Sequence, residues 1–531
     1  MVVDLDPANG SKKSGIALSR PSACERLRET IINPPFHSHG FFILYTSLAI
    51  VTIHSNGVLL KSDMNRNDSR AVIADPFIQR KLIFLLSTIL FFSVLNGTMF
   101  NVSLPDIAQD FRLLPSQVSW VMSGFIIIFA VSTATYSRIA DIYSLKNLIV
   151  IGLILFNVGS FLGFFAQWYP LLIAARIVQA SGCGAIPALG MLIATRYFPN
   201  ETKGRVLGTI ASTATLSAGI GPILGGFITQ TLHWRYLFVI SIITLATIPS
   251  FRRYLPDHAE QGGRFDTAGA ILMAGAVGSF LLLITLALWW ILPVSALLMI
   301  CFLVHINRKK SPFLSPSLFR NRPYRNMVFV AFLCLGSFYA MLFMTPLMLR
   351  DLNSLGTGSI GLVMFPGAIS AAMVGSIGGK FMDRKGSMPV AYTAMVLLIA
   401  GFFLLSIVAG LDAWVVALDL IPGYVAFTLM QSSLAHTVSS VLPKEELGIG
   451  MGMYNLFFFM SGAFSAAVVG KFLDVSKGQA PVNPLAITFS GGPYSNLNLL
   501  IAAIVGLALL LFYMTFRGVP EKGAFHTQTD T

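Results

Sequence analysis

Charged residues are scarce in this chain. Only 11% of its 531 residues are Asp, Glu, Lys or Arg, whereas 55% are hydrophobic and the mean hydropathy is +0.74. Because soluble domains carry about 25% charged residues, the composition excludes a soluble protein and predicts a polytopic membrane protein. The net charge of +13 is then expected to mark cytoplasmic loops, where Lys and Arg accumulate, and not a nucleic-acid partner.

Cysteines and catalytic motifs are also few. The cysteines at 24, 183, 301 and 334 form no CxxC pair, and the last three lie in apolar segments. We therefore expect packing residues, with no disulfide framework and no metal site. The chain has no HExxH, GxSxG, P-loop or paired-histidine haem motif, so an enzyme or an ATP-driven pump is disfavoured. No cofactor is expected.

Long apolar runs, by contrast, are abundant. Fourteen stretches of about 18–25 residues are each long enough to cross a hydrocarbon core of about 30 Å as an α-helix. They cover residues 82–104, 116–137, 147–166, 170–193, 205–229, 233–250, 267–285, 287–306, 325–347, 358–381, 388–409, 413–438, 449–472 and 496–516. The sequence therefore predicts an all-α integral membrane protein with 14 transmembrane helices.

Lys and Arg are divided unequally between the two sets of predicted loops. Twenty lie on the side of the C-terminal tail, and five lie on the opposite side. Loops rich in Lys and Arg stay in the cytoplasm, so we expect a multi-pass protein of the cell membrane with both ends of its core cytoplasmic. The lipid bilayer is its expected surrounding, and no oligomer is implied.

The first 63 residues fit poorly with the rest. They are mixed and polar except for Phe41–Leu60, which His54 weakens as a span, and they lack the layout of a signal peptide. Met64 opens a short polar segment of the kind that precedes a first span. Our hypothesis is that translation starts at Met64 and that 1–63 is a spurious extension. An intact mass that includes residue 1 would refute it.

Two segments repeat a common pattern. Tyr136–Lys146 and Gly379–Gly386 each end a helix rich in small residues with an Asp and then basic residues in a short turn. Eight spans separate them, which predicts two parallel halves of six spans with two helices inserted between them. The expected organisation is an extension (1–81), an N-terminal half (82–250), inserted helices and loops (251–324), a C-terminal half (325–516) and a cytoplasmic tail (517–531).

The segment Ser217–Gly226 carries a stripe of small residues. Ser217, Gly221 and Gly225 lie four residues apart on one helix face, Pro222 removes a backbone donor between them, and Gly226 follows. Such a stripe lets another helix approach closely inside a bilayer. An ordinary tight helix contact is the alternative to a functional element.

Several motifs now occur in a recognisable order. They are the loop Asp383-Arg384-Lys385-Gly386, Leu172–Gly184, Ser217–Gly226 and Arg264-Phe265-Asp266. On these the chain resembles the major facilitator superfamily, and within it the fourteen-span drug:proton antiporters. Asn101–Ala108, Phe365–Gly367 and Tyr494–Leu497 are similar to the tetracycline efflux proteins of Gram-positive bacteria. The resemblance runs from about residue 82 to 516.

The resemblance implies a function. It implies antibiotic resistance by proton-coupled efflux of a hydrophobic drug, with tetracycline as the best guess, and hence a small-molecule substrate and protons as partners. Monovalent cation/proton antiport, another substrate, or import by symport are alternatives. One departure weighs against tetracycline, because the pumps it resembles carry embedded acids where this chain has Gly97, Ala218 and Gly462.

Four residues are candidates for transport and coupling. Arg176 and Gln179 lie one turn apart in span 170–193, where a buried Arg costs about 2.5–3.5 kcal/mol and needs a partner or a cavity; a snorkelling anchor is the alternative. Asp419 lies about six residues into span 413–438 and could carry the proton, or be interfacial. Asp106 lies near the outer end of span 82–104, where a solvated carboxylate is the alternative. Other polar residues in or beside spans are Asn96, Asn101, Gln117, Trp120, Asn157, Gln431, His436 and Asn455.

A cytoplasmic gate is the last predicted element. Asp141 with Lys146, and Asp383 with Arg384, lie at corresponding helix ends. As the resemblance implies, these charges would form a latch that holds the inner side closed and breaks as the halves rock. Solvated ion pairs, worth about 0–1 kcal/mol, are the alternative.

Overall fold

The computed structural model describes residues 75–140, 142–256, 266–286, 289–309, 316–442 and 446–517. Every regular element in these ranges is a helix, and 14 helices are long and apolar enough to cross a membrane. The predicted all-α membrane fold is confirmed. The segment 1–63, Met64 and Asp141 lie outside the described residues.

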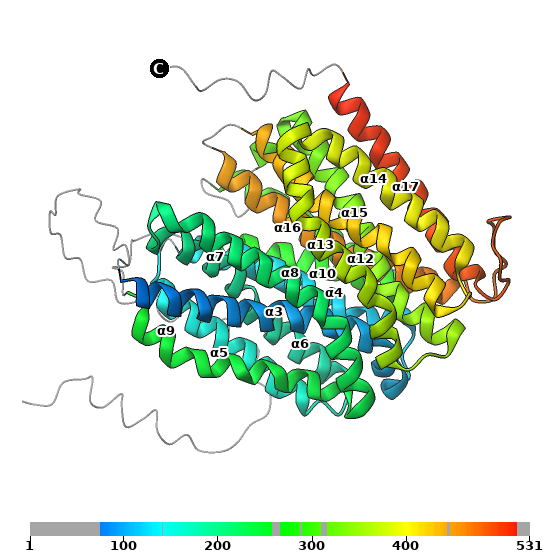
Figure 1. The fold of residues 1–531 in the computed structure, drawn as a ribbon, viewed down its shortest axis with the longest axis horizontal. Coiled ribbons are helices and arrows are strands. Elements are labelled where there is room, and N and C mark those ends of the chain that lie inside the picture. Colours follow the sequence, from blue (N-terminus) through cyan, green and yellow to red (C-terminus); the bar gives the residue numbers. More distant parts are fainter. Residues whose placement is uncertain are drawn as a thin grey trace, which may run out of the picture. The chain divides into compact units, whose positions relative to one another are not determined.

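The helices form two groups with an inserted pair between them in the chain (Figure 1). The first group comprises α3 (Pro76–Phe111), α4 (Pro115–Ile139), α5 (Leu145–Phe164), α6 (Tyr169–Cys183), α7 (Ala185–Tyr197), α8 (Asn200–Thr231), η2 (Trp234–Thr247) and α9 (Ile248–Tyr254). The second comprises α12 (Arg322–Asn353), α13 (Thr357–Lys385), α14 (Ser387–Val408), α15 (Ala413–Ser440), α16 (Leu447–Val475) and α17 (Gly492–Phe516), preceded by the short η3 (Pro316–Arg320).

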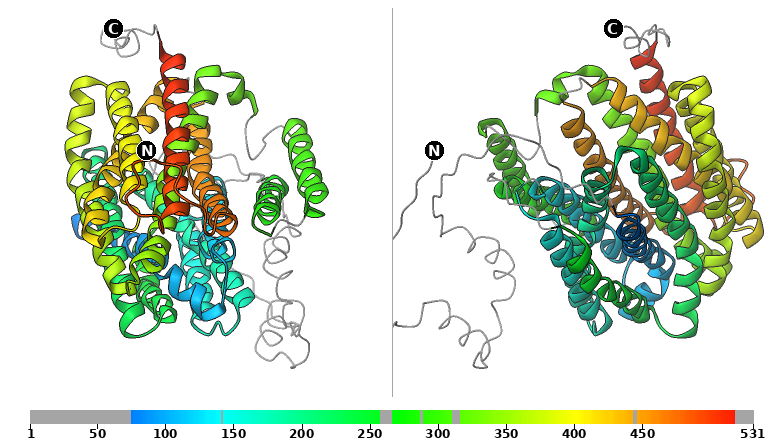
Figure 2. Two further views of the ribbon diagram at one scale, coloured as in Figure 1. Left: turned by 90° about the vertical axis from the view of Figure 1, so that its right-hand side faces the viewer. Right: turned by 60° about the vertical axis from the view of Figure 1, so that its left-hand side comes forward.

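The inserted pair, α10 (Thr267–Leu286) and α11 (Ile291–Arg308), stands beside the two groups (Figure 2). Helix α10 packs on α4 and α16, and α11 packs chiefly on α10. Buried Asp266 joins the two inserted helices: its Oδ1 lies 2.7 Å from Nε2 of His305 and 3.4 Å from Nζ of Lys309. Exposed Cys301 on α11 corrects the expectation that it packs, whereas Cys183 and Cys334 are buried.

Several helices extend beyond their predicted apolar spans. Helix α3 begins six residues before span 82–104, because the Asp75 side chain accepts a hydrogen bond from Phe77 N (2.8 Å) and Pro76 occupies the first turn. It continues past the span to Phe111 and ends where Arg112 adopts a left-handed conformation. Asp106 therefore lies inside a helix.

Two predicted spans are built from two helical pieces. Span 170–193 is α6 followed by α7, which meet at Gly184; a Cβ there would lie 2.8 Å from Ser132 Cβ, so the missing side chain permits close packing on α4. Span 233–250 is the 3₁₀ helix η2 followed by α9. Within η2, the hydroxyls of Thr244 and Thr247 donate to carbonyls three residues earlier, at 2.6 Å each.

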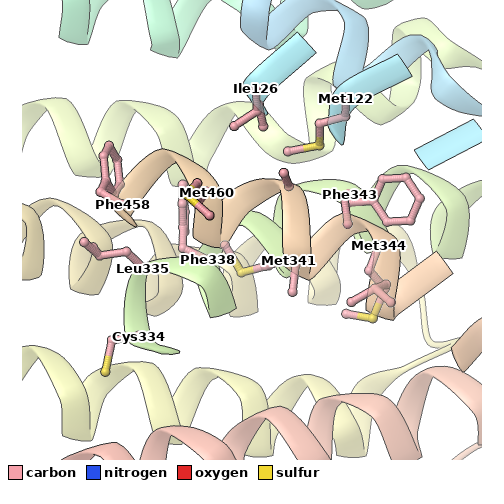
Figure 3. Packing of buried hydrophobic residues seen from close by; sticks show 14 of the residues in the cluster. Met122, Ile126, Cys334, Leu335, Phe338, Met341, Phe343, Met344, Phe458 and Met460 are labelled. Carbon is pink, nitrogen blue, oxygen red and sulfur yellow. The ribbon is translucent and has the colours of Figure 1, made fainter. Parts of the chain in front are cut away.

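The two groups meet through α4 on α16 and α8 on α13. Buried apolar residues continue across the first contact: Met122 and Ile126 of α4 share one cluster with Met341 and Met344 of α12 and with Met460 of α16 (Figure 3). This core positions the polar residues described next.

Candidate functional site

Arg176 of α6 is buried among hydrogen-bond acceptors. Its Nη1 donates to Asn96 Oδ1 of α3 (2.9 Å) and to Gln179 Oε1 (2.7 Å), and its Nε donates to the Val121 carbonyl of α4 (3.3 Å). Gln179 Nε2 in turn donates to Ser160 Oγ of α5 (2.8 Å). Four helices of the N-terminal group therefore converge on one guanidinium.

Aromatic rings complete the surroundings of Arg176. Its Cζ lies 4.1 Å from the ring centre of Phe100 and 4.0 Å from that of Phe125, which stabilises the cation through the ring faces. In the part of the chain that the structure describes, no carboxylate pairs with it. At 2% exposure, Arg176 is not a snorkelling anchor, and that alternative is wrong.

The small-residue stripe of α8 faces α3. Ser217 Oγ donates to the Phe91 carbonyl. A Cβ on Gly221 would lie 2.7 Å from Thr98 Cβ, and one on Gly225 would lie 2.8 Å from Met99 Cα. Both distances are too short for real side chains, so the backbones approach directly, as the predicted stripe requires.

A second small-residue edge of α8 faces α13 of the other group. A Cβ on Gly226 would lie 2.6 Å from the Thr357 carbonyl, and one on Gly361 would lie 3.1 Å from the carbonyl carbon of Pro222. Helix α8 thus lies between α3 and α13 (Figure 1). The residues singled out in the sequence sit on both of these contacts.

Asp106 joins the two groups at one end of the helices. Its carboxylate pairs with Arg350 of α12 and accepts a hydrogen bond from Thr357 Oγ1 of α13. Arg350 Nη2 also donates to Thr357 Oγ1 (3.2 Å). We call Asp106, Arg350 and Thr357 the Asp106 latch, and the surface around it, predicted to lie outside the cell, the Asp106 face. A simply solvated Asp106 is therefore wrong.

Further contacts close the Asp106 face between the groups. Ser116 N donates to Asp474 Oδ1 (3.3 Å), and Ser123 Oγ donates to the Ala463 carbonyl (3.0 Å). A Cβ on Gly470 would lie 2.7 Å from the Pro115 carbonyl oxygen. Helices α4 and α16 are therefore held together at this face.

Asp419 is placed apart from these groups. It is the seventh residue of α15, about 9 Å along the helix at 1.5 Å per residue. Its Oδ2 is buried and has no hydrogen-bond partner. No ion pair or hydrogen bond in the described ranges joins Asp419 to Arg176 or to Asp106. An acid inside a span without a partner is a group that can take up a proton.

The predicted cytoplasmic gate stays a prediction. Asp141 lies outside the described residues, and Lys146 is half-buried in the first turn of α5. Asp383 and Arg384 lie in the last turn of α13, and their side chains are outside what the structure describes.

Gly97, Ala218 and Gly462, which stand where the tetracycline pumps that the sequence resembles carry acids, differ in the space around them. No atom lies within 4 Å of the place where a Gly97 side chain would begin, so that position faces open space. A side chain at Gly462 would begin 2.9 Å from the Tyr339 ring. Ala218 is half-buried on α8. An acid would fit at residue 97 but would collide at residue 462.

The C-terminal group carries a set of packed rings. Phe338 of α12 and Phe427 of α15 stack with centres 3.9 Å apart and an interplanar angle of 13°. Tyr424 and Phe458 pack around this pair, with centres 5.1 Å from Phe338 and 6.4 Å from Phe427 respectively. The Tyr424 hydroxyl is buried without a partner. We call Phe338, Tyr424, Phe427 and Phe458 the aromatic wall.

The sequence missed some of these partners. The predicted span 325–347 ends before Arg350, whereas α12 runs to Asn353 and includes it. Pro346, inside that helix, does not end it. Thr357 gave no signal, since a single Thr at a helix start is common. The sequence marks Asn96 only as one of several polar residues in or beside spans.

Two packed groups of apolar helices with an inserted pair, fourteen membrane-length helices in the described residues, and charged residues enclosed between helices fit a multi-pass membrane protein of the transporter type. The sequence profile of the Major Facilitator Superfamily matches residues 86–466, and the chain belongs to this family. The riboflavin transporter RibZ of Clostridioides difficile (strain 630) is 26% identical over 442 residues, covering 80% of this chain and 95% of RibZ.

Other comparisons agree with this family. The multidrug transporter MdtP of Bacillus subtilis (strain 168) is 26% identical over 413 residues, covering 73% of this chain and 74% of MdtP. Among solved structures, the nucleoside transporter NupG matches with a TM-score of 0.58 at 14% identity, covering 82% of this chain and 99% of NupG. The family and this structural neighbour are transporters, not enzymes.

Proposed function

We propose that this transporter exports a hydrophobic small molecule in exchange for protons. The two halves rock against each other, and the substrate path opens alternately to each side of the membrane. The multidrug transporters among its relatives support export of a drug-like compound. The resemblance to antiporters in the α8 segment supports exchange with protons.

The observation that carries the proposal is the packing of α8. Its glycines place bare backbone against α3 on one side and α13 on the other. The contact with α13 lies between the halves, where close backbone packing would exclude water. An exchanger needs such a contact, because protons leaking through it would not drive export. The Asp106 latch closes the same side by charge.

Asp419 is proposed as the proton carrier. It is buried at Oδ2 and unpartnered, and the positions of Gly97, Ala218 and Gly462 supply no carboxylate. Taking up a proton would remove the unfavourable charge from the span. Arg176, whose Nε and Nη1 donate to neutral acceptors, would fix the packing of the N-terminal helices and contribute to the electrostatic field along the substrate path.

Transport in membrane vesicles tests the proposal. Inverted vesicles containing the full chain would be energised to an acid interior, and tetracycline, the best single candidate, would be added. Uptake of tetracycline with alkalinisation of the interior supports it. Alkalinisation with another drug, or with Na⁺ or K⁺, but not with tetracycline would support proton exchange and would exclude tetracycline as the substrate. A wild-type chain that transports nothing against a proton gradient contradicts the proposal.

A flavin-like substrate is the second candidate. The rings of the aromatic wall are packed and largely buried, so they would have to separate to take a substrate; their faces and the unpartnered Tyr424 hydroxyl would then suit a planar heterocycle with polar edges. The similarity to a riboflavin transporter favours it independently. Competition between riboflavin and tetracycline in the same vesicles decides between the two substrates.

A further inference from the structure

A cavity of about 260 Å³ lies at the Asp106 face, where α5 ends and η2 begins. Its lining consists of Phe164, Phe165, Gln167, His233, Arg235 and Tyr236. It belongs wholly to the N-terminal group and shares no residue with the Asp106 latch, Asp419 or the surroundings of Arg176. The proposed transport function therefore leaves this cavity unexplained.

Asp110, the acid that contacts the cavity lining in the described part of the chain, is already engaged. Its Oδ2 accepts a hydrogen bond from Trp234 Nε1 (2.7 Å) and lies 3.0 Å from His233 Nε2. His233 Nδ1 accepts from the backbone N of Arg235 (3.3 Å). The ring of His233 is therefore held between the Asp110 carboxylate and the backbone of Arg235.

Arg235 is left with an unbalanced positive charge. Its Nε is buried and has no hydrogen-bond partner, and no described carboxylate pairs with it. Its Cζ lies 5.3 Å from the ring centre of Trp234. A guanidinium held against a ring, with donors still unused, is suited to bind an anion with several oxygens, above all a phosphate.

The surface around the cavity is strongly apolar. Phe161 of α5 and Phe165, which follows the last residue of α5, are 64% and 56% exposed, and Ile242 and Ile243 of η2 are 51% exposed each. Trp168, 60% exposed, lies just beyond the end of α5. In a membrane-spanning protein, aromatic residues at helix ends sit at headgroup level and the apolar faces below them contact acyl chains.

We propose that this cavity binds the phosphate of an anionic phospholipid, with Arg235 as the anchoring cation. The acyl chains would lie along the exposed faces of α5 and η2. The combination of one unpaired cation and an adjoining apolar surface matches an amphiphile, whereas a soluble phosphate would use only the cation. The site would tie a structural lipid to the lateral side of the N-terminal half.

Lipid binding to the purified full chain tests this site. Detergent-solubilised protein would be titrated with phosphatidylglycerol, phosphatidylcholine and glycerol 1-phosphate, and bound lipid would be counted by native mass spectrometry. We expect phosphatidylglycerol to bind most tightly and Arg235→Gln to weaken its binding about tenfold, as the loss of a charge-assisted contact predicts. Arg112→Gln, which removes an exposed cation from the same face, should leave binding unchanged.

Two further measurements make the test decisive. Arg235→Lys keeps the charge and should retain more binding than Arg235→Gln, which separates loss of the site from misfolding. Equal binding of phosphatidylglycerol and phosphatidylcholine would overturn an anionic headgroup site. Binding of glycerol 1-phosphate as tight as that of the lipid would overturn a lipid site in favour of a soluble phosphate. Wild-type binding by Arg235→Gln would overturn the role of Arg235.

Discussion

Arg176 and Asp419 are charged residues inside spans of opposite halves, and their surroundings differ in kind. Arg176 is enclosed by three acceptors and two aromatic rings. Asp419 has a buried oxygen with no hydrogen-bond partner. A satisfied charge stabilises one arrangement of helices, whereas an unsatisfied one gains by changing its protonation state. We therefore propose a structural role for Arg176 and proton exchange for Asp419.

The largest effect is expected for Asp419→Asn. The amide keeps the size of the side chain but cannot exchange a proton, so proton-driven transport should be abolished while the amount of protein in the membrane is unchanged. Uptake by energised vesicles measures the first, and quantitative immunoblotting measures the second.

Asp412→Asn is the matched control for that variant. Asp412 is an exposed acid at the start of the same helix, and its side chain makes no capping hydrogen bond. It should transport like the wild type. Full activity of Asp419→Asn would show that Asp419 does not carry the coupled proton. The proposed difference in function between Asp419 and Arg176 would then be wrong.

The next effect is on stability, and it concerns Arg176. Arg176→Met removes hydrogen bonds to Asn96, Gln179 and the Val121 carbonyl and leaves those acceptors buried. Breaking such a network costs about 3 kcal/mol. Thermal unfolding in detergent should therefore show a lower midpoint for Arg176→Met and little change for Asp419→Asn. The reverse order would contradict the two assignments.

A third prediction moves an acid into the N-terminal half. Gly97 faces open space, whereas Gly462 faces the Tyr339 ring. In an Asp419→Asn background, Gly97→Glu should restore part of the proton-driven transport, because it supplies a new embedded carboxylate. Gly462→Glu, which collides with Tyr339, should restore none and should lower the yield of folded protein. Rescue by Gly462→Glu alone would show that the free space beside Gly97 and Gly462 does not determine where an introduced carboxylate supports proton-driven transport.

Much of the fold could be predicted from the sequence, because apolar runs of membrane length report directly on burial in lipid. The residues at which helices end could not be predicted in this way. The apolar pattern stops at residue 104, yet α3 continues to Phe111 with Asp106 and Asp110 inside it. Polar residues near a membrane surface do not end a helix when other helices supply their partners.

Some polar residues of the candidate site could be picked out from the sequence, but their pairings could not. Arg176 needed acceptors, and the sequence contained Asn96 among several polar residues in spans, but nothing in the chain order joins residues 80 positions apart. The stripe of α8 was predictable, because a spacing of four residues fixes a helix face. That its neighbours are α3 and α13 follows only from the packing of the two halves.

The smallest effect is expected at the Asp106 latch. Asp106 and Arg350 are 25% and 29% exposed, so water and ions screen the pair, and Asp106→Asn should cost no more than about 1 kcal/mol of stability. Its effect should appear in the balance between conformations: the Asp106 face should open more often, seen as faster labelling of a cysteine placed at Ser116, which lies at the α4–α16 contact.

Asp351→Asn is the control for the latch. Asp351 accepts a hydrogen bond from Tyr494 within the C-terminal half, so its loss breaks no contact between halves and should leave the labelling rate unchanged. An equal increase for both variants would mean that any lost charge at this face loosens it. An increase for Asp106→Asn alone would show that the Asp106 latch acts on the equilibrium between conformations open and closed at this face. Arg176 and Asp419 are expected to act on stability and on proton exchange instead.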